Sequence, residues 1–250
     1  MEYYFGRKQI DLLRGGGQYD DQGNQNDNWI CIDDDWMKYE REITCNGNFK
    51  NGIKIGKWNI ILEETLIIGG SFDESGFKHG DWVCVHNDWN KLSREVNLKG
   101  QFVKGQKIAI WNIIEGNTVL GGGEFDENGR KNGKWVELCD DWRKLQHLNW
   151  QNRNVKFTGQ YKNGIKIGKC NIFVNEEAND RLLGGGEFDD YGMKEKIWVE
   201  LCKDWMDIKQ INGEYKKSKK FGKCDIIENG NLFIGSGSYK LKWYEGWQMD

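Results

Sequence analysis

The sequence predicts an all-β protein, an elongated antiparallel β-hairpin meander of about nine hairpins. Its 250 residues include 33 glycines and 13 tryptophans but no proline. A glycine-rich aromatic segment recurs along the whole chain, and the Asn-Gly pairs within it are strong signals for hairpin turns. Proline would remove backbone donors from a sheet, and glycine adds almost nothing to a thick core. Together these features favour one thin, aromatic-rich sheet.

A long form of the repeat begins near residues 15, 69, 121 and 184. Each copy opens with consecutive glycines and an aromatic residue, and a tryptophan follows that aromatic after 10 residues. The four pairs are Tyr19 and Trp29, Phe72 and Trp82, Phe125 and Trp135, and Phe188 and Trp198. We expect a three-residue loop, such as residues 74–76, to close each long hairpin through a bulge, with Gly76 in the left-handed conformation.

A short form alternates with the long one and begins near residues 47, 100, 159 and 213. Here the spacing from the aromatic to the next marker residue is 9, and that marker is tryptophan or cysteine. The four pairs are Phe49 and Trp58, Phe102 and Trp111, Tyr161 and Cys170, and Tyr215 and Cys224. Asn51-Gly52 and Asn163-Gly164 predict two-residue type I′ turns, which need positive φ at both positions.

These turns predict one cross-strand register for both forms. In the short form the expected pairs are Phe49 with Lys54, Gly47 with Gly56, and Cys45 with Trp58. In the long form they are Phe72 with Lys78, Gly70 with Gly80, and Ile68 with Trp82. Strand alternation then places the rings and the facing glycines on one side of the sheet, where the rings cover the glycines.

The ring-and-glycine side is the candidate interaction face. Exposed tryptophan and tyrosine dominate protein interfaces, so we expect this face to be open to a partner. Its residues are Phe49, Trp58, Phe72, Trp82, Phe102, Trp111, Phe125, Trp135, Tyr161, Phe188, Trp198 and Tyr215.

The repeats predict a single array over residues 1–250, with partial units at both ends. Asp-Trp follows each long-form tryptophan, and we interpret it as a corner between hairpins. No run of 18 apolar residues or secretory signal is present, which favours a soluble cytoplasmic protein. The net charge of −3 argues against a nucleic-acid partner.

No catalytic residue, metal site or cofactor is expected. The seven cysteines form neither a CxxC motif nor a Cys/His pairing, so reduced thiols are expected. The triple glycines lack the Lys-Ser/Thr of a phosphate-binding loop, and acidic clusters such as Asp20-Asp21 lack the ligand spacing of a calcium loop. His79, His86 and His147 occupy no common repeat position, and we interpret them as surface or turn residues.

The short form resembles the MORN repeat, and more closely its variant Y-x-x-G-x-K-x-G-x-W. YKNGIKIGKC (residues 161–170) and FKNGIKIGKW (residues 49–58) match that pattern nearly fully. FVKGQKIAIW (residues 102–111) departs from it through Ala109 and an off-register turn. The alternation of forms is similar to that of variant-MORN arrays of ciliates. The resemblance covers essentially the whole chain and implies an elongated hairpin scaffold with no catalytic residues in the repeat.

Three functions fit these observations. The first is a non-enzymatic scaffold for a protein partner or for self-association through the ring face. The second is a peripheral module for anionic membranes, because a cluster of lysines at a hairpin tip attracts acidic lipids. That cluster comprises Lys216, Lys217, Lys219, Lys220 and Lys223. The third is a glycan or small-ligand binder that uses tryptophans as stacking platforms.

Overall fold

A computed structural model of the chain is all-β. It describes residues 15–32, 43–62, 65–66, 69–85, 96–138, 155–175, 180–201, 209–228 and 232–239. The chain divides into two compact units, residues 1–118 with 127–129 and residues 119–126 with 130–250. Successive strands of each unit pair in antiparallel fashion, and the prediction of an all-β hairpin meander is confirmed. No helix among the described residues is long and apolar enough to cross a membrane.

Unit 1 holds the strands β1 to β9, which pair in chain order with one exception. The short β5 pairs with β4 alone, and β4 also pairs with β6. Two long hairpins, β1–β2 and β6–β7, alternate with two short ones, β3–β4 and β8–β9. The bounds are β1 (Gly16–Tyr19), β2 (Gln25–Ile32), β3 (Ile43–Lys50), β4 (Ile53–Leu62), β5 (Thr65–Leu66), β6 (Gly70–Phe72), β7 (Lys78–Val85), β8 (Val96–Val103) and β9 (Gln106–Glu115).

Unit 2 repeats this order and adds one strand. The long hairpins are β10–β11 and β14–β15, the short ones are β12–β13 and β16–β17, and β18 pairs with β17. The bounds are β10 (Thr118–Phe125), β11 (Lys131–Leu138), β12 (Val155–Lys162), β13 (Ile165–Asn175), β14 (Asp180–Phe188), β15 (Lys194–Leu201), β16 (Lys209–Lys216), β17 (Lys219–Glu228) and β18 (Leu232–Tyr239).

Every short hairpin closes through two residues with positive φ, as a type I′ turn requires. The pairs are Asn51-Gly52, Lys104-Gly105, Asn163-Gly164 and Lys217-Ser218. The expectation of an off-register turn in the second short form is wrong. Phe102 faces Lys107 there, just as Phe49 faces Lys54 in the first, because Lys104-Gly105 takes the Asn-Gly position.

Every long hairpin closes through a wider loop that an aspartate organises. The Asp73 backbone N–H donates to the Phe77 carbonyl at 2.9 Å, and Gly76 has a φ of 81°. The Asp73 side chain accepts hydrogen bonds from the backbone N–H of Ser75 and Phe77, each at 2.9 Å. Asp20 forms the same turn in the first long hairpin. The predicted bulged loop is therefore confirmed, and these aspartates are turn formers.

Beyond the aromatic position the predicted register is wrong. In β10–β11 Glu124 faces Asn132, but Gly123, the residue before it, faces Trp135. The tryptophan strand thus carries two extra residues, a bulge that the simple alternation of faces omits. In β3–β4 the same bulge places Cys45 opposite Ile60, so neither the Gly47–Gly56 nor the Cys45–Trp58 pairing forms.

A residue with positive φ lies two positions before each tryptophan or its cysteine replacement. Its φ values span 55° to 71°, and five of the eight positions are glycine. The eight are Asp27, Gly56, Gly80, Ala109, Gly133, Gly168, Lys196 and Gly222. This second glycine of the motif serves the bulge, whereas the first glycine lies beneath the indole. At Gly47, an added Cβ would come within 2.3 Å of the Trp58 ring.

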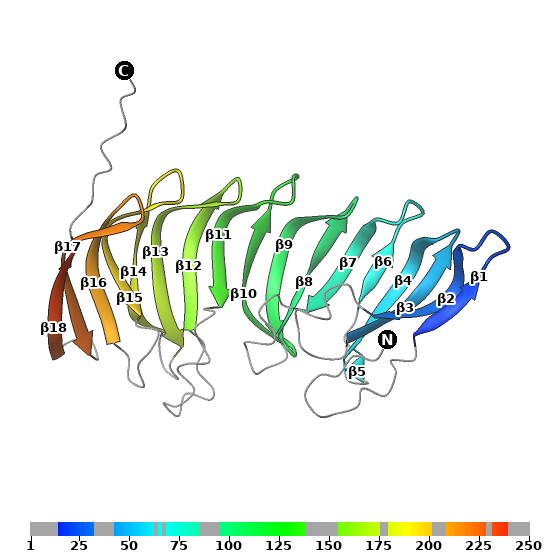
Figure 1. Ribbon diagram of the computed structural model, residues 1–250, viewed down its shortest axis with the longest axis horizontal. Helices are drawn as coiled ribbons and strands as arrows, with labels where there is room; N and C mark the ends of the chain where they lie inside the picture. Colours follow the sequence, from blue (N-terminus) through cyan, green and yellow to red (C-terminus); the bar gives the residue numbers. More distant parts are fainter. Residues whose placement is uncertain are drawn as a thin grey trace, which may run out of the picture. The chain divides into compact units, whose positions relative to one another are not determined.

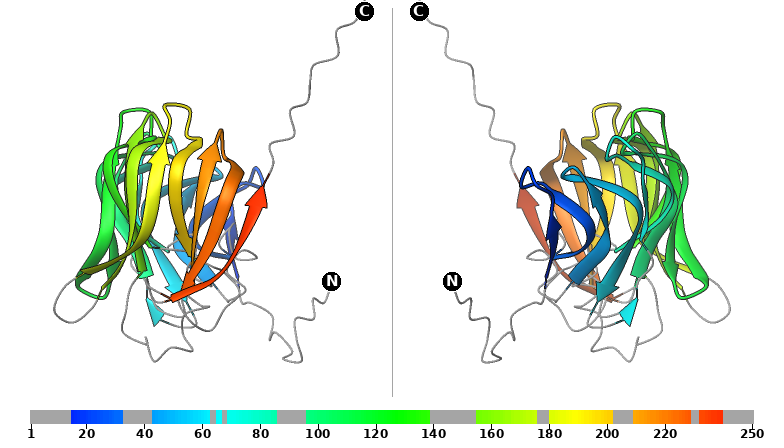
Figure 2. Two further views of the ribbon diagram at one scale, coloured as in Figure 1. Left: turned by 90° about the vertical axis from the view of Figure 1, so that its left-hand side faces the viewer. Right: turned by 90° about the vertical axis from the view of Figure 1, so that its right-hand side faces the viewer.

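Each short hairpin is joined at its turn to the long hairpin before it. The second turn residue of each short hairpin donates its backbone N–H to a carbonyl at the start of the preceding tryptophan strand. The bonds are Gly52 to Gln25, Gly105 to Lys78, Gly164 to Lys131 and Ser218 to Lys194, all between 2.8 and 3.0 Å. The turns of each unit therefore lie at the same end of its strands, and this row of turns is here called the turn edge (Figures 1 and 2).

Candidate interaction face

The predicted ring residues of unit 1 form a continuous aromatic ladder. Each ring meets the next edge to face, with centroids 5.0 to 5.9 Å apart. The order is Tyr19, Trp29, Phe49, Trp58, Phe72, Trp82, Phe102 and Trp111. Edge-to-face contacts contribute about 0.5–1.5 kcal/mol each beyond burial, so the ladder is a major stabilising element of this unit.

In unit 2 cysteine replaces the tryptophan of both short hairpins. Phe125, Trp135 and Tyr161 form one stack, and Phe188, Trp198 and Tyr215 form a second. At Cys170 the missing indole is replaced from the opposite strand. An added Cβ on Gly159 would lie 3.1 Å from Phe157 Cε1 and 3.5 Å from Cys170 Cβ, so Phe157 covers the glycine that an indole covers elsewhere.

The ring face is not open, contrary to expectation. The tryptophans described by the structure are at most 8% exposed, and Phe49, Phe102, Tyr161 and Tyr215 are also buried. Phe72, Phe125 and Phe188 are partly buried. The indoles fold back onto glycine backbone and neighbouring rings instead of projecting outward. These residues therefore form the core of each unit.

The bulge gives each indole nitrogen a backbone partner. Trp82 Nε1 donates to the Ser71 carbonyl at 3.0 Å, and Trp135 Nε1 donates to the Glu124 carbonyl at 3.0 Å. Trp29, Trp111 and Trp198 donate to the equivalent carbonyls of their hairpins. A buried indole N–H needs such a partner, and the widened ladder exposes a carbonyl at the required place.

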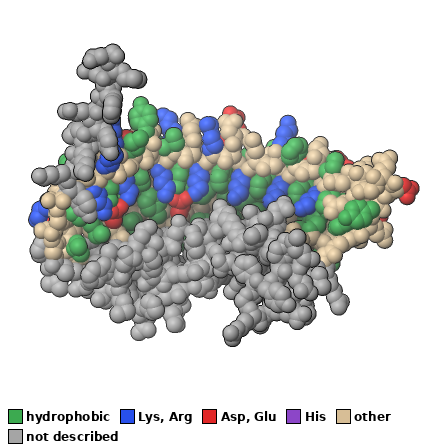
Figure 3. All heavy atoms as spheres, viewed as in Figure 1, with side chains coloured by type: hydrophobic (Ala, Val, Ile, Leu, Met, Phe, Trp, Pro, Cys, Tyr) green, Lys and Arg blue, Asp and Glu red, His purple; other side chains and the backbone are tan. Residues whose placement is uncertain are grey.

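Lysine side chains cover the rings. Lys54 Nζ lies 4.7 Å from the Trp58 centroid and 5.9 Å from that of Phe72. Lys78 Nζ lies 4.7 Å from Trp82 and 5.4 Å from Phe102. Figure 3 shows Lys and Arg side chains spaced over the strands of each unit, with hydrophobic side chains between them. Such cation–π contacts are stronger when the ammonium is partly desolvated.

In unit 2 two glutamates bind these lysines. Glu200 pairs with the Lys194 ammonium and with Lys220 Nζ at 2.9 Å, and it accepts a hydrogen bond from the Tyr215 hydroxyl at 2.5 Å. Burial opposes ionisation of Glu200, but these donors outweigh it and lower its pKa to about 2. Burial and the adjacent carboxylate raise the pKa of Tyr215 to about 12.

Glu137 has the same surroundings in the preceding pair of hairpins. It binds the Lys131 ammonium, Lys166 Nζ at 3.1 Å and the Tyr161 hydroxyl at 2.7 Å. Burial works against its charge, yet the lysines and the tyrosine hold its pKa below the ordinary value. Each glutamate thus closes a four-residue cluster above the rings.

Three repeat positions change together between the units. In unit 1 they hold cysteine, phenylalanine and tryptophan; in unit 2 they hold glutamate, tyrosine and cysteine. The unit 1 sets are Cys31, Phe49, Trp58 and Cys84, Phe102, Trp111; those of unit 2 are Glu137, Tyr161, Cys170 and Glu200, Tyr215, Cys224. Sequence reasoning missed these clusters, although aligning the repeats on their tryptophans would have revealed the exchange.

The five-lysine cluster expected at the last short hairpin is divided. Lys220 binds Glu200, and Lys223 Nζ lies 2.9 Å from Asp225 Oδ1. Lys216, Lys217 and Lys219 are exposed at the β16–β17 turn. The structure therefore places three of the five side chains at the tip and uses the other two in ion pairs.

Some of the exposed apolar side chains gather along the turn edge of each unit, while others, such as Ile110 and Ile197, lie along the strands. Those at the turn edge are Ile53, Phe77 and Val103 in unit 1, and Ile165, Tyr191 and Met193 in unit 2. Phe77 is 52% exposed and Tyr191 is 80% exposed. All six lie in or beside the hairpin turns, where solvated polar residues are usual. They were not predicted from the sequence, because the repeat motif placed the interaction surface on the rings.

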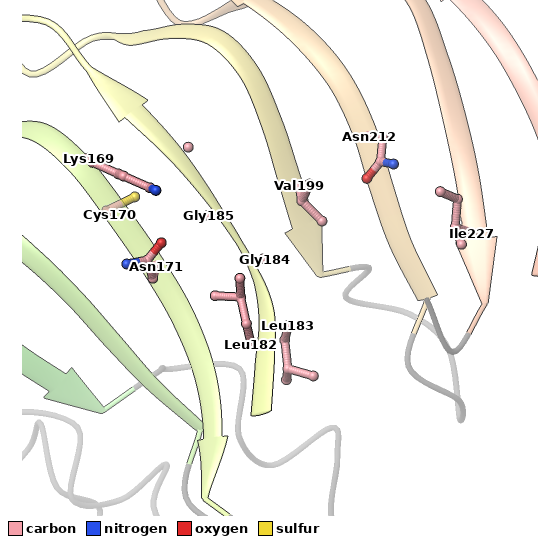
Figure 4. Close-up of a pocket in the computed structure, with 11 residues that line it drawn as sticks. Lys169, Cys170, Asn171, Leu182, Leu183, Gly184, Gly185, Val199, Asn212 and Ile227 are labelled. Carbon is pink, nitrogen blue, oxygen red and sulfur yellow. The ribbon is translucent and has the colours of Figure 1, made fainter. Parts of the chain in front are cut away.

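Unit 2 also contains an open hollow of about 490 Å³ beside the glycines of β14 (Figure 4). Its walls include Leu182, Val199, Asn212 and Ile227, and none of the described residues that line it carries a carboxylate, histidine or hydroxyl group. Over the described ranges, no group of three or more His, Cys, Asp or Glu side chains could hold a metal ion. His79 is exposed on β7, whereas His86 and His147 lie outside the described residues.

Comparison with known proteins leaves the chain unassigned. No protein-family model matches it, and no curated protein matches it in sequence.

Proposed function

We propose that the protein is a non-enzymatic scaffold that binds a protein partner or a second copy of itself through the turn edge. The observation that carries this proposal is the gathering of exposed apolar side chains at that edge in both units, while the aromatic surplus is used inside the fold. Contiguous apolar surface on a folded protein is typical of interaction sites.

The regular spacing of the turns supports a scaffold function. The turn-to-carbonyl hydrogen bonds hold neighbouring tips in fixed order within each unit, so an extended partner can contact several tips at once. Contacts of this kind add through effective concentration even when each one is weak. The resemblance to MORN arrays, which implies the same class of function, stays a prediction.

The two alternatives have less support. Lys220 and Lys223 of the expected lipid-binding cluster form ion pairs with Glu200 and Asp225, which reduces the charge that the cluster presents to a membrane. A glycan site would need exposed indole faces, and the tryptophans within the described ranges are buried.

The test compares the chain with a turn-edge variant, Phe77→Ser with Tyr191→Ser. Size-exclusion chromatography with light scattering measures self-association, and pull-downs with the chain as bait measure partner binding. We expect the variant to fold with an unchanged circular dichroism spectrum and to lose at least one association. Associations that are indifferent to both changes would contradict the proposal. Salt-sensitive flotation with anionic liposomes, lost when Lys216, Lys217 and Lys219 become Gln, would instead favour the membrane alternative.

A further inference from the structure

The glutamate clusters of unit 2 show that this hairpin can bind a carboxylate above its rings. Glu137 and Glu200 each contact two lysines and a tyrosine hydroxyl, and their side chains are only 18% and 22% exposed. Charged groups held this way form hydrogen bonds roughly twice as strong as neutral ones. The lysine pair and the ring therefore constitute a carboxylate site that the chain fills from within.

Unit 1 keeps the lysine of this site but not the acid. Lys78 lies 5.4 Å from the Phe102 centroid, much as Lys131 lies 5.1 Å from that of Tyr161. Cys84 takes the position of Glu137: it faces Leu98 across the strands, where Glu137 faces Phe157. A cysteine side chain is shorter than glutamate and ordinarily uncharged, so it cannot neutralise the ammonium.

Two lysines of unit 1 lack an acidic partner within the described part of the chain. Lys54 and Lys78 are partly buried and contact rings, and neither forms an ion pair with a described residue. The lysines at the same repeat positions and in the same order in unit 2, Lys166 and Lys194, bind Glu137 and Glu200. A partly desolvated ammonium gains considerably from an anion at hydrogen-bonding distance.

The positions of the two lysines define the spacing of the anions that they suit. Lys54 is on β4 and Lys78 is on β7, and β6 lies between these strands. The Trp58, Phe72 and Trp82 centroids beneath them follow one another at 5.9 and 5.2 Å, which places the two ammonium groups roughly 10 Å apart. A polyproline II segment advances about 9.3 Å in three residues and presents every third side chain on the same side. Acidic residues three apart in such a segment match the spacing of the two ammonium groups and lie on one side of the segment.

We propose that Lys54 and Lys78 bind two carboxylates of an acidic, extended segment of a partner protein, with a Glu-x-x-Glu spacing. The partner supplies to unit 1 the charge that Glu137 and Glu200 supply within unit 2. The inference rests on the proposed function, since it presupposes a protein partner, and it names the chemistry of that partner.

Three peptides of equal length test the spacing and the charge. The first repeats Glu-Pro-Pro three times, the second repeats Gln-Pro-Pro, and the third has the first composition with its three glutamates adjacent. Titration of the full chain at low salt, followed by calorimetry, should show the first peptide binding at least about tenfold more tightly than the second. The third should bind several-fold more weakly than the first. Equal binding of the first and second peptides would overturn the proposal.

Matched variants of the full chain locate the site. Lys54→Gln with Lys78→Gln should lower affinity for the first peptide by at least about tenfold. Lys50→Gln with Lys57→Gln removes the same amount of charge from exposed residues on the opposite face of the β3–β4 hairpin. This control variant should bind the first peptide with unchanged affinity. An equal loss in both variants would show that only net charge matters and would overturn the proposal.

A second variant keeps both lysines and so remains informative if the first one does not fold. Cys84→Glu with Phe102→Tyr copies the Glu137 and Tyr161 pair into unit 1, where the new carboxylate takes Lys78. Peptide affinity should fall severalfold although no cation is lost, and unchanged affinity would contradict the proposal. Phosphatidylserine vesicles that bind through Lys54 and Lys78 while the peptide does not would also overturn it.

Peptide binding and turn-edge association are separate measurements. Loss of association in the Phe77 and Tyr191 variant tests the scaffold, whereas peptide affinity in the lysine variants tests the carboxylate site. If peptide binding fails while turn-dependent association persists, this inference alone is wrong. If the reverse holds, the proposed use of the turn edge is wrong.

Discussion

In unit 1 the lysine of each short hairpin lies over an indole ring, whereas in unit 2 it binds a glutamate. Lys54 and Lys107 are 4.7 and 4.6 Å from the Trp58 and Trp111 centroids. Lys166 and Lys220 are 3.1 and 2.9 Å from the oxygens of Glu137 and Glu200. The same backbone therefore gives the lysine ammonium one of two partners, the face of a ring in unit 1 or a carboxylate in unit 2.

The difference teaches which interactions each unit depends on. Unit 1 depends on indoles packed over glycine, a largely apolar interaction that involves no titrating group. Unit 2 replaces two of its indoles by cysteine and adds charged clusters, which respond to pH. The comparison can be tested by moving side chains between the units.

The largest effect is expected from Trp58→Cys. It removes a buried ring that is 2% exposed, and large-to-small changes of this kind cost about 3–5 kcal/mol. Adding Cys45→Phe copies the Phe157 and Cys170 arrangement of unit 2, so we expect the double variant to recover at least half of the loss. Urea unfolding measures both free energies. A double variant no more stable than the single one would show that Phe157 does not substitute for an indole.

The next largest effect is expected from alanine at a glycine beneath an indole, compared with alanine at a glycine that faces cysteine. An alanine at position 100 would place its Cβ 2.3 Å from the Trp111 ring, whereas at position 213 the nearest atom is Cys224 Sγ at 3.6 Å. We expect Gly100→Ala to destabilise the protein by about 2–3 kcal/mol and Gly213→Ala to change stability by less than about 0.5 kcal/mol. Thermal unfolding of the two variants checks this. Similar losses at both positions would mean that the strand, not the ring, requires glycine.

Acid should destabilise unit 2, because its glutamate clusters lose their charge. The pKa of Glu200 is lowered to about 2 from an ordinary 4.5, so its contribution is present above pH 4.5 and is lost as the pH falls from 4.5 to 2. We expect a loss on the order of 2 kcal/mol in the urea unfolding free energy over that interval, allowing for solvent screening. Glu200→Gln should be less stable at pH 7 and show a smaller loss in acid. Glu124→Gln, at an exposed position, is the control. If it reduced the acid-induced loss of stability as much as Glu200→Gln does, the loss would not come from the Glu200 cluster.

The smallest effect concerns the bulge. Ala109 and Lys196 have φ values of 55° and 62°, which cost little for glycine but strain other residues. Ala109→Gly in unit 1 and Lys196→Gly in unit 2 should each stabilise the protein by up to about 1 kcal/mol. Thermal unfolding measures the gain. Destabilisation by glycine would indicate that side-chain contacts at these positions outweigh the backbone strain.

Much of the fold could be predicted because hairpin turns are local. The Asn-Gly pairs and the Asp-centred loops correctly placed Phe49 opposite Lys54 and Phe72 opposite Lys78. The register beyond these pairs could not be derived by alternation, since the two-residue bulge depends on a positive φ at the second motif glycine. Alternation assigned that glycine to the ring face, and the bulge removes it.

The candidate site was predicted less well than the fold. The ring residues were identified by number, but their burial depends on indoles folding back over glycine, which sequence spacing does not report. The Glu137 and Glu200 clusters join residues from neighbouring hairpins, so no single motif contains them. Among the exposed turn residues, Ile53 and Ile165 share one repeat position and Phe77 and Met193 share another, a signal that lies outside the glycine and aromatic motif.

The contact between glycine and indole also has an evolutionary consequence. A glycine beneath an indole cannot change before the ring is lost, so the order of substitutions is constrained. The short hairpins of unit 2 have lost the indole, but Gly159 is still restricted by Phe157 at 3.1 Å, whereas Gly213 meets only a sulfur at 3.6 Å. A side chain should therefore be accepted at position 213 before position 159, and either change should block the return of tryptophan at the facing position, 224 or 170.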